Sequence, residues 1–267
     1  MHASPSCCQW TDADTVASSR SNAIKRDDRP NAVEDISKDQ ISIQGWMFPI
    51  SDVIPSRTTP VVTIGLIVLN ALAFVYELNL SDAELERLAR TAGTVPAAFS
   101  VADVLTSMFL HGGWLHFLGN MLYLWIFGDN VEDSFGRVRF LLFYLVCGAV
   151  AALTQVAIHP SSTVPMIGAS GAIAGVMGAY FMLFPQSRVL AGVFIIFFID
   201  VIEIPAIFFL GVWFLMQLFS GVGSLVETAD GGIAFFAHVG GFAFGALAGG
   251  IARLRARARG DYWRGAF

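Results

Sequence analysis

Ser170 and His238 are the two residues whose types and spacing point most directly to chemistry. Ser170 opens a small-residue apolar segment, and His238 lies inside the next apolar segment but one. Each stands 15 residues before the residue that ends its segment, Pro185 for the serine and Arg253 for the histidine. If both segments cross a membrane in the same direction, the two side chains lie at equal depth. Polar groups at that depth are costly and mark functional sites, so the pair predicts a serine nucleophile with a histidine base.

His116 and Asn120 form a second candidate group within the stretch His-Gly-Gly-Trp-Leu-His-Phe-Leu-Gly-Asn. They are four residues apart, so they share one face of a helix. Both carry N–H donors that could turn toward a tetrahedral intermediate beside Ser170. The free N–H groups at the start of the serine's own helix could add to such an oxyanion site. We expect His111 to be structural, in a loop turned by glycines, and assign no role to His159.

Each candidate also has a purely structural interpretation. The glycines around Ser170 could serve only helix packing. His238 could be a buried histidine bonded to a backbone carbonyl. Asn120 could make an interhelical hydrogen bond, and His116 could be an interfacial residue.

Small residues recur at four-residue spacing on two of the apolar segments. One row follows His238 and the other starts at Ser170, and both would allow close backbone approach. If these rows pack together, the imidazole comes within reach of the hydroxyl. The members of the two rows are Gly241, Gly245 and Gly249, and Ser170, Ala174 and Gly178 with Gly171 and Gly175 alongside.

The composition is that of a membrane protein. Of the 267 residues, 55% are hydrophobic and 14% charged, and the mean hydropathy is +0.63. Soluble domains usually carry about 25% charged residues. The net charge of −5 implies no nucleic-acid surface. The three cysteines, Cys7, Cys8 and Cys147, offer neither a disulfide framework nor a metal-ligand spacing, and we expect no metal and no cofactor.

Six apolar segments predict six transmembrane helices. A further apolar run at 189–199 has only 11 residues, too few to cross about 30 Å of hydrocarbon, and is expected to be interfacial or re-entrant. Ser81-Asp82-Ala83-Glu84 reads as a capping box that opens a short amphipathic helix between the first two spans. The predicted spans are residues 61–78, 114–128, 140–158, 171–184, 204–222 and 233–252.

The arginines set the expected orientation. With the N-terminus inside, the outer loops hold only Arg87 and Arg90, which is the positive-inside pattern. Both termini are then cytoplasmic, and the candidate chemistry lies toward the outer face. The inner flanks hold Arg57, Arg137, Arg139, Arg188, Arg253, Arg255, Arg257 and Arg259.

The polar ends of the chain suggest three regions. Residues 1–56 are predicted to be a largely disordered cytoplasmic tail, because they show no apolar periodicity. Residues 57–253 would form the six-helix domain, and residues 254–267 a basic cytoplasmic tail. No apolar signal-peptide core is visible in the first 20 residues, and Met47 begins a segment that looks like a natural start.

Taken together, the motifs resemble the rhomboid family of intramembrane serine proteases. The matching stretches are residues 111–116 with Asn120, 168–172, and 237–241 with Gly245, in the family's order across about residues 47–253. The resemblance implies an all-α membrane protein with a six-transmembrane-helix bundle and a Ser170–His238 dyad without an acidic third member. It also implies an oxyanion site from Asn120, His116 and the Ser170 N–H. The helix holding residues 205–221 would act as a mobile wall for substrate entry.

Two positions depart from the family pattern. Many members carry Trp-Arg early in the outer loop, where this chain has Ala102-Asp103, so the anchoring of that loop stays open. Some members place a tyrosine four residues after the serine, under the imidazole, where this chain has Ala174. The group that orients His238 also stays open.

The resulting hypothesis is an intramembrane serine endopeptidase that cleaves transmembrane segments of other membrane proteins. Its partners would be single-span membrane proteins and the lipid bilayer, and its location a bacterial plasma (inner) membrane, which it crosses several times. The first alternative is a non-catalytic rhomboid-like protein that binds transmembrane helices. The second is a transporter or channel, but the sequence shows one broken region near residues 200–205 and no inverted repeat.

Overall fold

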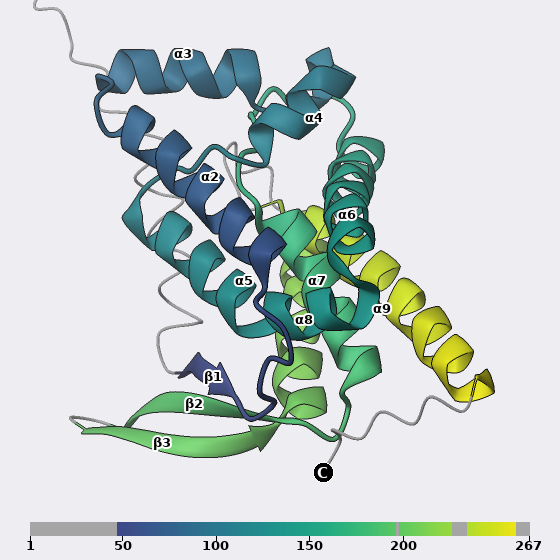
Figure 1. Cartoon of the computed structure of the whole chain (residues 1–267). Coiled ribbons are helices and arrows are strands. Elements are labelled where there is room, and N and C mark those ends of the chain that lie inside the picture. The colour runs from purple at the N-terminus through teal and green to yellow at the C-terminus, as the bar shows by residue number, and fades with distance from the viewer. Residues whose placement is uncertain (1–46, 196–197, 226–233, 260–267) are drawn as a thin grey trace, which may run out of the picture. The chain divides into compact units, whose positions relative to one another are not determined.

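The computed structural model describes residues 47–195, 198–225 and 234–259, all within the compact unit Ala32–Phe267. These residues form a helical bundle with a small sheet at one end (Figure 1). The main helices are α2 (Val61–Glu77), α5 (Trp114–Phe135), α6 (Arg137–Ile158), α7 (Ser170–Leu183), α8 (Ala206–Ser224) and α9 (Phe235–Ala258). Shorter helices are α3 (Asp82–Ala92), η1 (Pro96–Ala98) and α4 (Val101–Ser107), and the strands are β1 (Met47–Asp52), β2 (Arg188–Ile195) and β3 (Phe198–Pro205).

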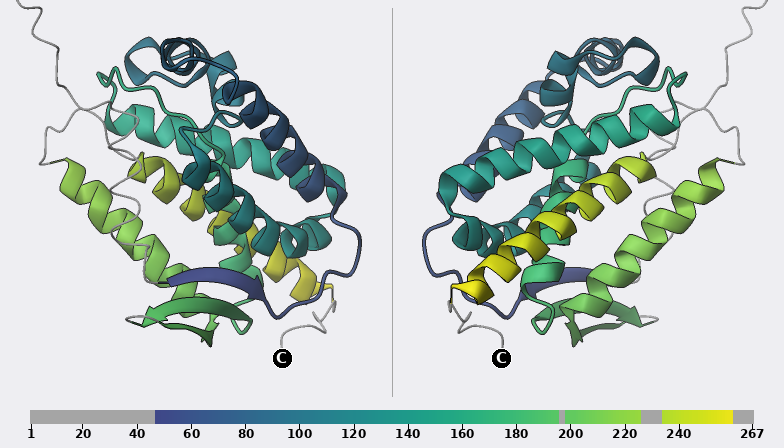
Figure 2. Two further views of the ribbon diagram at one scale, coloured as in Figure 1. Left: turned by 90° about the vertical axis from the view of Figure 1, so that its left-hand side faces the viewer. Right: turned by 90° about the vertical axis from the view of Figure 1, so that its right-hand side faces the viewer.

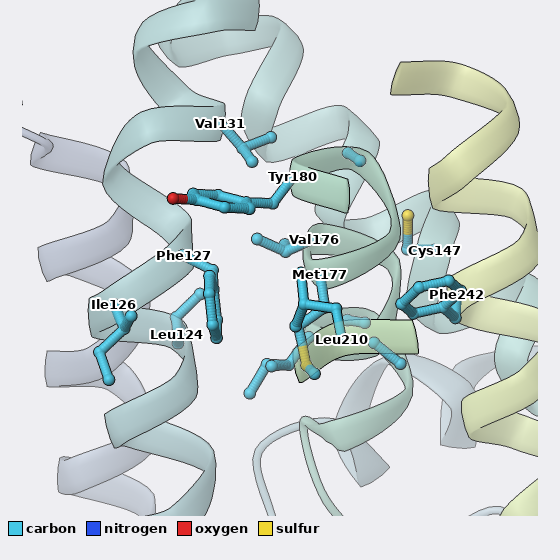
Figure 3. Packing of buried hydrophobic residues seen from close by; sticks show 14 of the residues in the cluster. Leu124, Ile126, Phe127, Val131, Cys147, Val176, Met177, Tyr180, Leu210 and Phe242 are labelled. Carbon is cyan, nitrogen blue, oxygen red and sulfur yellow. The ribbon is translucent and has the colours of Figure 1, made fainter. Parts of the chain in front are cut away.

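Helix α7 lies at the centre of the bundle. Residues 171–180 are all buried, and α5, α6, α8 and α9 surround them. In Figure 3, Tyr180 lies among Phe127, Val131 and Val176, all apolar side chains of α5 and α7. At 14 residues, α7 measures only about 21 Å, shorter than the hydrocarbon core of a bilayer. A helix enclosed by protein need not match the membrane thickness.

Helices α7 and α9 approach each other backbone to backbone. A Cβ added at Gly241 would collide with the Gly171 carbonyl oxygen, and one added at Gly245 with the Gly175 carbonyl. At Gly249, an added Cβ would lie 2.7 Å from the Ala179 carbonyl oxygen. The row Gly241, Gly245 and Gly249 therefore packs on Gly171, Gly175 and Ala179, one position along α7 from the predicted row Ser170, Ala174 and Gly178.

The outer faces of the bundle are apolar. Large hydrophobic side chains point away from the core on several helices, an arrangement that soluble proteins avoid and a bilayer favours. Helices α6, α8 and α9 have the length and composition to cross a membrane, while α2 and α7 are apolar but shorter. Among the exposed apolar residues are Leu72, Trp125, Leu142, Leu153, Phe208, Val212, Leu215, Phe219, Leu247 and Leu254.

Capping contacts and turn residues set several helix ends. The buried Glu132 carboxylate accepts hydrogen bonds from the N–H groups of Val62 and Thr63, at 3.0 and 2.8 Å, and so caps α2. Gly136, at φ +78°, makes the one-residue turn between α5 and α6. Helix α7 ends before Pro185, because the residue preceding a proline is disfavoured in the helical conformation.

The three-stranded sheet is the main feature that the sequence analysis did not predict. β2 pairs antiparallel with β1 on one side and with β3 on the other. The apolar run at 189–199 thus belongs to a hairpin, which agrees with its being too short to span but differs from a re-entrant segment. Residues 47–52 were expected in a disordered tail, and this was wrong, because they pair with β2. Residues 1–46 lie outside the described part of the chain.

A buried hydrogen-bond cluster fastens the sheet to the bundle. The Asp52 carboxylate accepts from the Tyr180 hydroxyl at 2.6 Å and from the Asn130 side-chain amide at 2.9 Å. Tyr180 also shares a 2.8 Å hydrogen bond with Ser187, the residue before β2. Burial raises the pKa of Asp52 to about 6, and the nearby Asp129 charge adds to the rise.

The end of the bundle opposite the sheet carries α3 and α4 (Figure 2). The predicted capping box opens α3: the Ser81 N–H and hydroxyl both donate to Glu84, at 2.8 and 2.6 Å. This end is called the α3 end below, and the other the sheet end.

The close approach of α7 and α9 makes Gly245 intolerant of any side chain. Gly245→Ala should lower stability by about 1–3 kcal/mol, because the added Cβ meets backbone atoms that cannot rotate away. Gly65→Ala on α2 is the control: nothing lies within 4 Å of its added Cβ, so its stability should be unchanged or slightly higher. Thermal unfolding in detergent, followed by tryptophan fluorescence, measures both. Equal melting temperatures for the two variants would contradict the packing described.

The Asp52 carboxyl predicts a pH dependence of stability. Folding raises the pKa of the Asp52 carboxyl from 3.8 to about 6. The stability that the folded state draws from the protonated carboxyl is therefore fully present below pH 3.8 and is lost as the pH rises through 6. The side chain of Asp52→Asn cannot ionise. The melting temperature of this variant should therefore rise relative to that of wild type as the pH goes from 5 to 7.5. With half-burial taken into account, the gain should be about 1 kcal/mol, or roughly 2–4 °C. A constant difference across this range would show that Asp52 is not the titrating group.

Candidate active site

Ser170 is the first residue of α7, at the end of an irregular segment. Gly168, at φ +120°, turns the chain, and Ala169 leads into the helix. A non-glycine residue would be strained at this φ. Because the first N–H groups of a helix have no partner within it, the backbone around Ser170 presents free donors beside its own hydroxyl.

The segment before α7 is covered by the loop that links α3 to α4. Thr94 and Met166 exchange backbone hydrogen bonds at 3.0 and 2.9 Å, and the Gly168 N–H donates to the Ser107 carbonyl at 2.8 Å. These bonds satisfy irregular backbone inside the bundle, which is the condition for its existence at membrane depth. They also anchor the loop without the Trp-Arg pair that Ala102-Asp103 replaces.

His238 lies in the first turn of α9, and its Nε2 is 2.8 Å from the Ser170 hydroxyl oxygen. The histidine is buried, with 6% of its surface exposed. The two residues that the sequence analysis paired are therefore in contact. The arrangement has the geometry of a nucleophile with its base, since proton transfer needs heavy atoms about 2.6–3.2 Å apart.

Helix α8 supplies two contacts to the imidazole that the sequence analysis did not predict. The Gln217 side-chain oxygen lies 2.7 Å from His238 Nδ1, and the Trp213 ring centre lies 5.9 Å from that of His238. Gln217 is buried, and it is an amide in an otherwise largely apolar helix. A single amide in an apolar helix could have indicated this contact from the sequence, because a buried amide among apolar residues needs a polar partner.

His116 and Asn120 lie on the other side of Gly168. A Cβ at that position would be 2.6 Å from His116 Nε2 and 3.6 Å from Asn120 Nδ2. His116 Nδ1 accepts from the Gly112 N–H at 3.3 Å, so in the neutral ring Nε2 carries the proton and is a donor. Within the described residues, the buried Asn120 Nδ2 has no hydrogen-bond partner. His116 Nε2 and Asn120 Nδ2 thus both lie close to the turn that precedes Ser170.

His111 and His159 stand apart from the serine. The His111 N–H donates to both oxygens of Glu77, and its ring packs edge-on against His116 with centres 5.2 Å apart. Burial lowers the pKa of His111 to about 3, so this ring stays neutral. His159 follows the end of α6 and contacts Phe236.

A cavity of about 40 Å³ adjoins the serine, bounded by the covering loop, α6 and the start of α7. A water molecule needs about 10–15 Å³ by this kind of measure and two or more polar partners. The cavity meets both requirements, because Thr94, Ser107 and Ser170 line it. Water can therefore be held beside the hydroxyl.

Comparison with known proteins agrees with this geometry. The Rhomboid domain model matches residues 98–255. The chain is 33% identical over 152 residues to RHOMBOID-like protein 4 of Arabidopsis thaliana, covering 57% of the chain and 34% of that protein. It is 34% identical over 109 residues to Rhomboid protease GluP of Bacillus subtilis, covering 40% of the chain and 21% of that protein. Rhomboid protein 1, mitochondrial, of Saccharomyces cerevisiae is 30% identical to the chain over 157 residues, covering 56% of the chain and 41% of that protein.

The matched regions span less than half of each of these three relatives. The residues that the family model matches include Ser170 and His238, in a bundle whose outward surface is apolar. With a family model that covers more than half of its 267 residues, the chain belongs to the rhomboid family of membrane proteins.

Proposed function

We propose that the protein is a serine endopeptidase that hydrolyses peptide bonds within the membrane. The observation that carries this proposal is the 2.8 Å contact between His238 Nε2 and the Ser170 hydroxyl, beside a partly open pocket that is large enough for water. The buried, unpartnered Asn120 Nδ2 and the nearby His116 Nε2 favour a catalytic site over a purely structural histidine–serine contact. The printed name of the relative GluP, a rhomboid protease, agrees with this function.

In the proposed mechanism, the Ser170 oxygen attacks the scissile carbonyl carbon while His238 Nε2 takes the hydroxyl proton. The carbonyl oxygen becomes an oxyanion, which the Ser170 N–H, His116 Nε2–H and Asn120 Nδ2–H stabilise. The C–N bond then breaks, and His238 returns the proton to the departing amine. A water molecule then attacks the acyl-enzyme, and His238 again acts as the base. This step releases the carboxylic acid product and restores the Ser170 hydroxyl.

The proposed substrates are single-span membrane proteins, because the site lies inside a bundle whose surface faces lipid. In the described part of the chain, a substrate's peptide bond would reach Ser170 between helices or past the covering loop. A non-catalytic rhomboid protein would bind such helices equally well but has no need of the serine–histidine contact. We propose that residues 57–253 form the protease unit, in a bacterial plasma membrane.

Substitutions at the dyad should act as a unit. Ser170→Ala and His238→Ala should each lower the cleavage rate of a single-span substrate by about 10⁴-fold or more, and the double variant should be little worse. His159→Ala is the control, since it does not contact Ser170 and should cleave near the wild-type rate. The measurement is the initial rate at matched folded protein. Residual cleavage by Ser170→Ala would rule out the assigned nucleophile.

The two side-chain donors should have graded effects. Asn120→Ala removes one oxyanion donor and should slow cleavage by about 10²–10³-fold, because the remaining donors persist. His116→Ala should lower the cleavage rate by the same factor or by a smaller one. A fluorophosphonate probe reports Ser170 reactivity separately from peptide cleavage. A wild-type cleavage rate for Asn120→Ala would show that Asn120 is not part of the oxyanion site.

The arginine distribution predicts that the sheet end faces the cytoplasm. Arg137 and Arg188 lie at the sheet end, whereas Arg87 and Arg90 lie on α3 at the opposite end. Reporter fusions after residues 134 and 257 should therefore read as inside, and a fusion after residue 162 as outside. An inside reading at 162 would invert the proposed orientation.

A further inference from the structure

The imidazole of His238 bridges two helices, and only one of its two contacts is explained by a serine–histidine dyad. Its Nε2 meets Ser170 on α7 at 2.8 Å, and its Nδ1 meets the Gln217 side-chain oxygen on α8 at 2.7 Å. Both His238 and Gln217 are buried, with 6% and 7% of their surfaces exposed. The contact between His238 and Gln217 joins two buried side chains, and both contacts have the length of a good hydrogen bond.

The Gln217 contact bears on which nitrogen of His238 holds the proton. A neutral imidazole accepts the serine proton at Nε2 only if its own hydrogen is on Nδ1. That tautomer needs an acceptor at Nδ1, which a carboxylate provides in serine proteases with a triad. Here the Gln217 oxygen occupies that place, so a neutral amide can fix the tautomer and the ring orientation. This answers the question left open by Ala174, which places no aromatic ring under the histidine.

The acceptor comes from a helix at the edge of the bundle. Helix α8 packs mainly on α9, and its other face exposes Val212, Leu215 and Phe219. Trp213 and Gln217 are one turn apart on its inward face, and both contact His238. A shift of about 1 Å at this level would break a 2.7 Å hydrogen bond.

We propose that Gln217 is a positioning residue that holds His238 in its base tautomer, so that the dyad is competent only when α8 is packed against α9. This inference rests on the proposed function. It assigns to α8 a part in activating the base, because the group that prepares the imidazole belongs to a different helix from both dyad residues. An opening of α8 would then switch off the base as well as widen the site.

Two substitutions at Gln217 separate an acceptor from a packing residue. Gln217→Met keeps the length and loses the acceptor, and its kcat should fall by about 10- to 100-fold, as for other residues that orient a reactive histidine. Gln217→Glu keeps the acceptor and adds charge, so it should retain most of the rate at high pH. Its pH–rate profile should move to higher pH, because a carboxylate retains a proton on the imidazole more strongly than an amide does. Leu215→Met, on the lipid-facing side of α8, is the matched control and should behave like wild type.

Nuclear magnetic resonance of ¹⁵N-labelled histidine reads the tautomer directly and needs no activity. Wild type should show protonated Nδ1 on His238, whereas Gln217→Met should show a mixture of tautomers. Equal kcat for wild type and Gln217→Met, or an unchanged pH profile in Gln217→Glu, would overturn the inference. If Gln217→Met does not fold, the pH profile of Gln217→Glu and the wild-type tautomer decide. Failure of the proposed function looks different, since wild type itself would then not cleave or label at Ser170.

Discussion

The close backbone contact between α7 and α9 is the constraint on which the rest of the structure depends. Glycines on both helices remove the side chains that would hold them apart, so carbonyl groups of α7 lie directly against the Cα atoms of α9. This approach places Ser170 and His238 in hydrogen-bond contact at the same end of the two helices. A bundle with ordinary helix spacing would separate the hydroxyl from the imidazole by the width of the missing side chains.

The remaining helices supply groups around this pair and carry neither the proposed nucleophile nor the proposed base. Helix α5 places His116 and Asn120 on the side of Gly168, and α8 places Gln217 on the far side of the imidazole. The neutral state of the surrounding polar groups suits an enclosed site, because an unpaired charge there would be far more costly than an amide or an imidazole. The site thus relies on oriented neutral dipoles.

The sheet end adds a second set of tertiary ties. Asp52 on β1 joins Asn130 on α5 and Tyr180 on α7, and the Ala206 N–H that starts α8 donates to the Ser187 carbonyl at 2.7 Å. The helices that surround the site are therefore fastened together about one α7 length away from it. Packing at the sheet end and geometry at the serine are linked through the same short helix.

The sequence by itself determined the membrane-protein class, the apolar character of the main helices and the pairing of Ser170 with His238, because hydropathy and residue spacing are local, periodic properties. It also indicated His116 and Asn120, since a four-residue offset fixes a shared helical face. Only the tertiary structure decided that β1 pairs with β2 and that Gln217 faces His238. Those contacts join residues far apart in the chain, and no periodicity within a segment specifies which distant partner a polar side chain will meet.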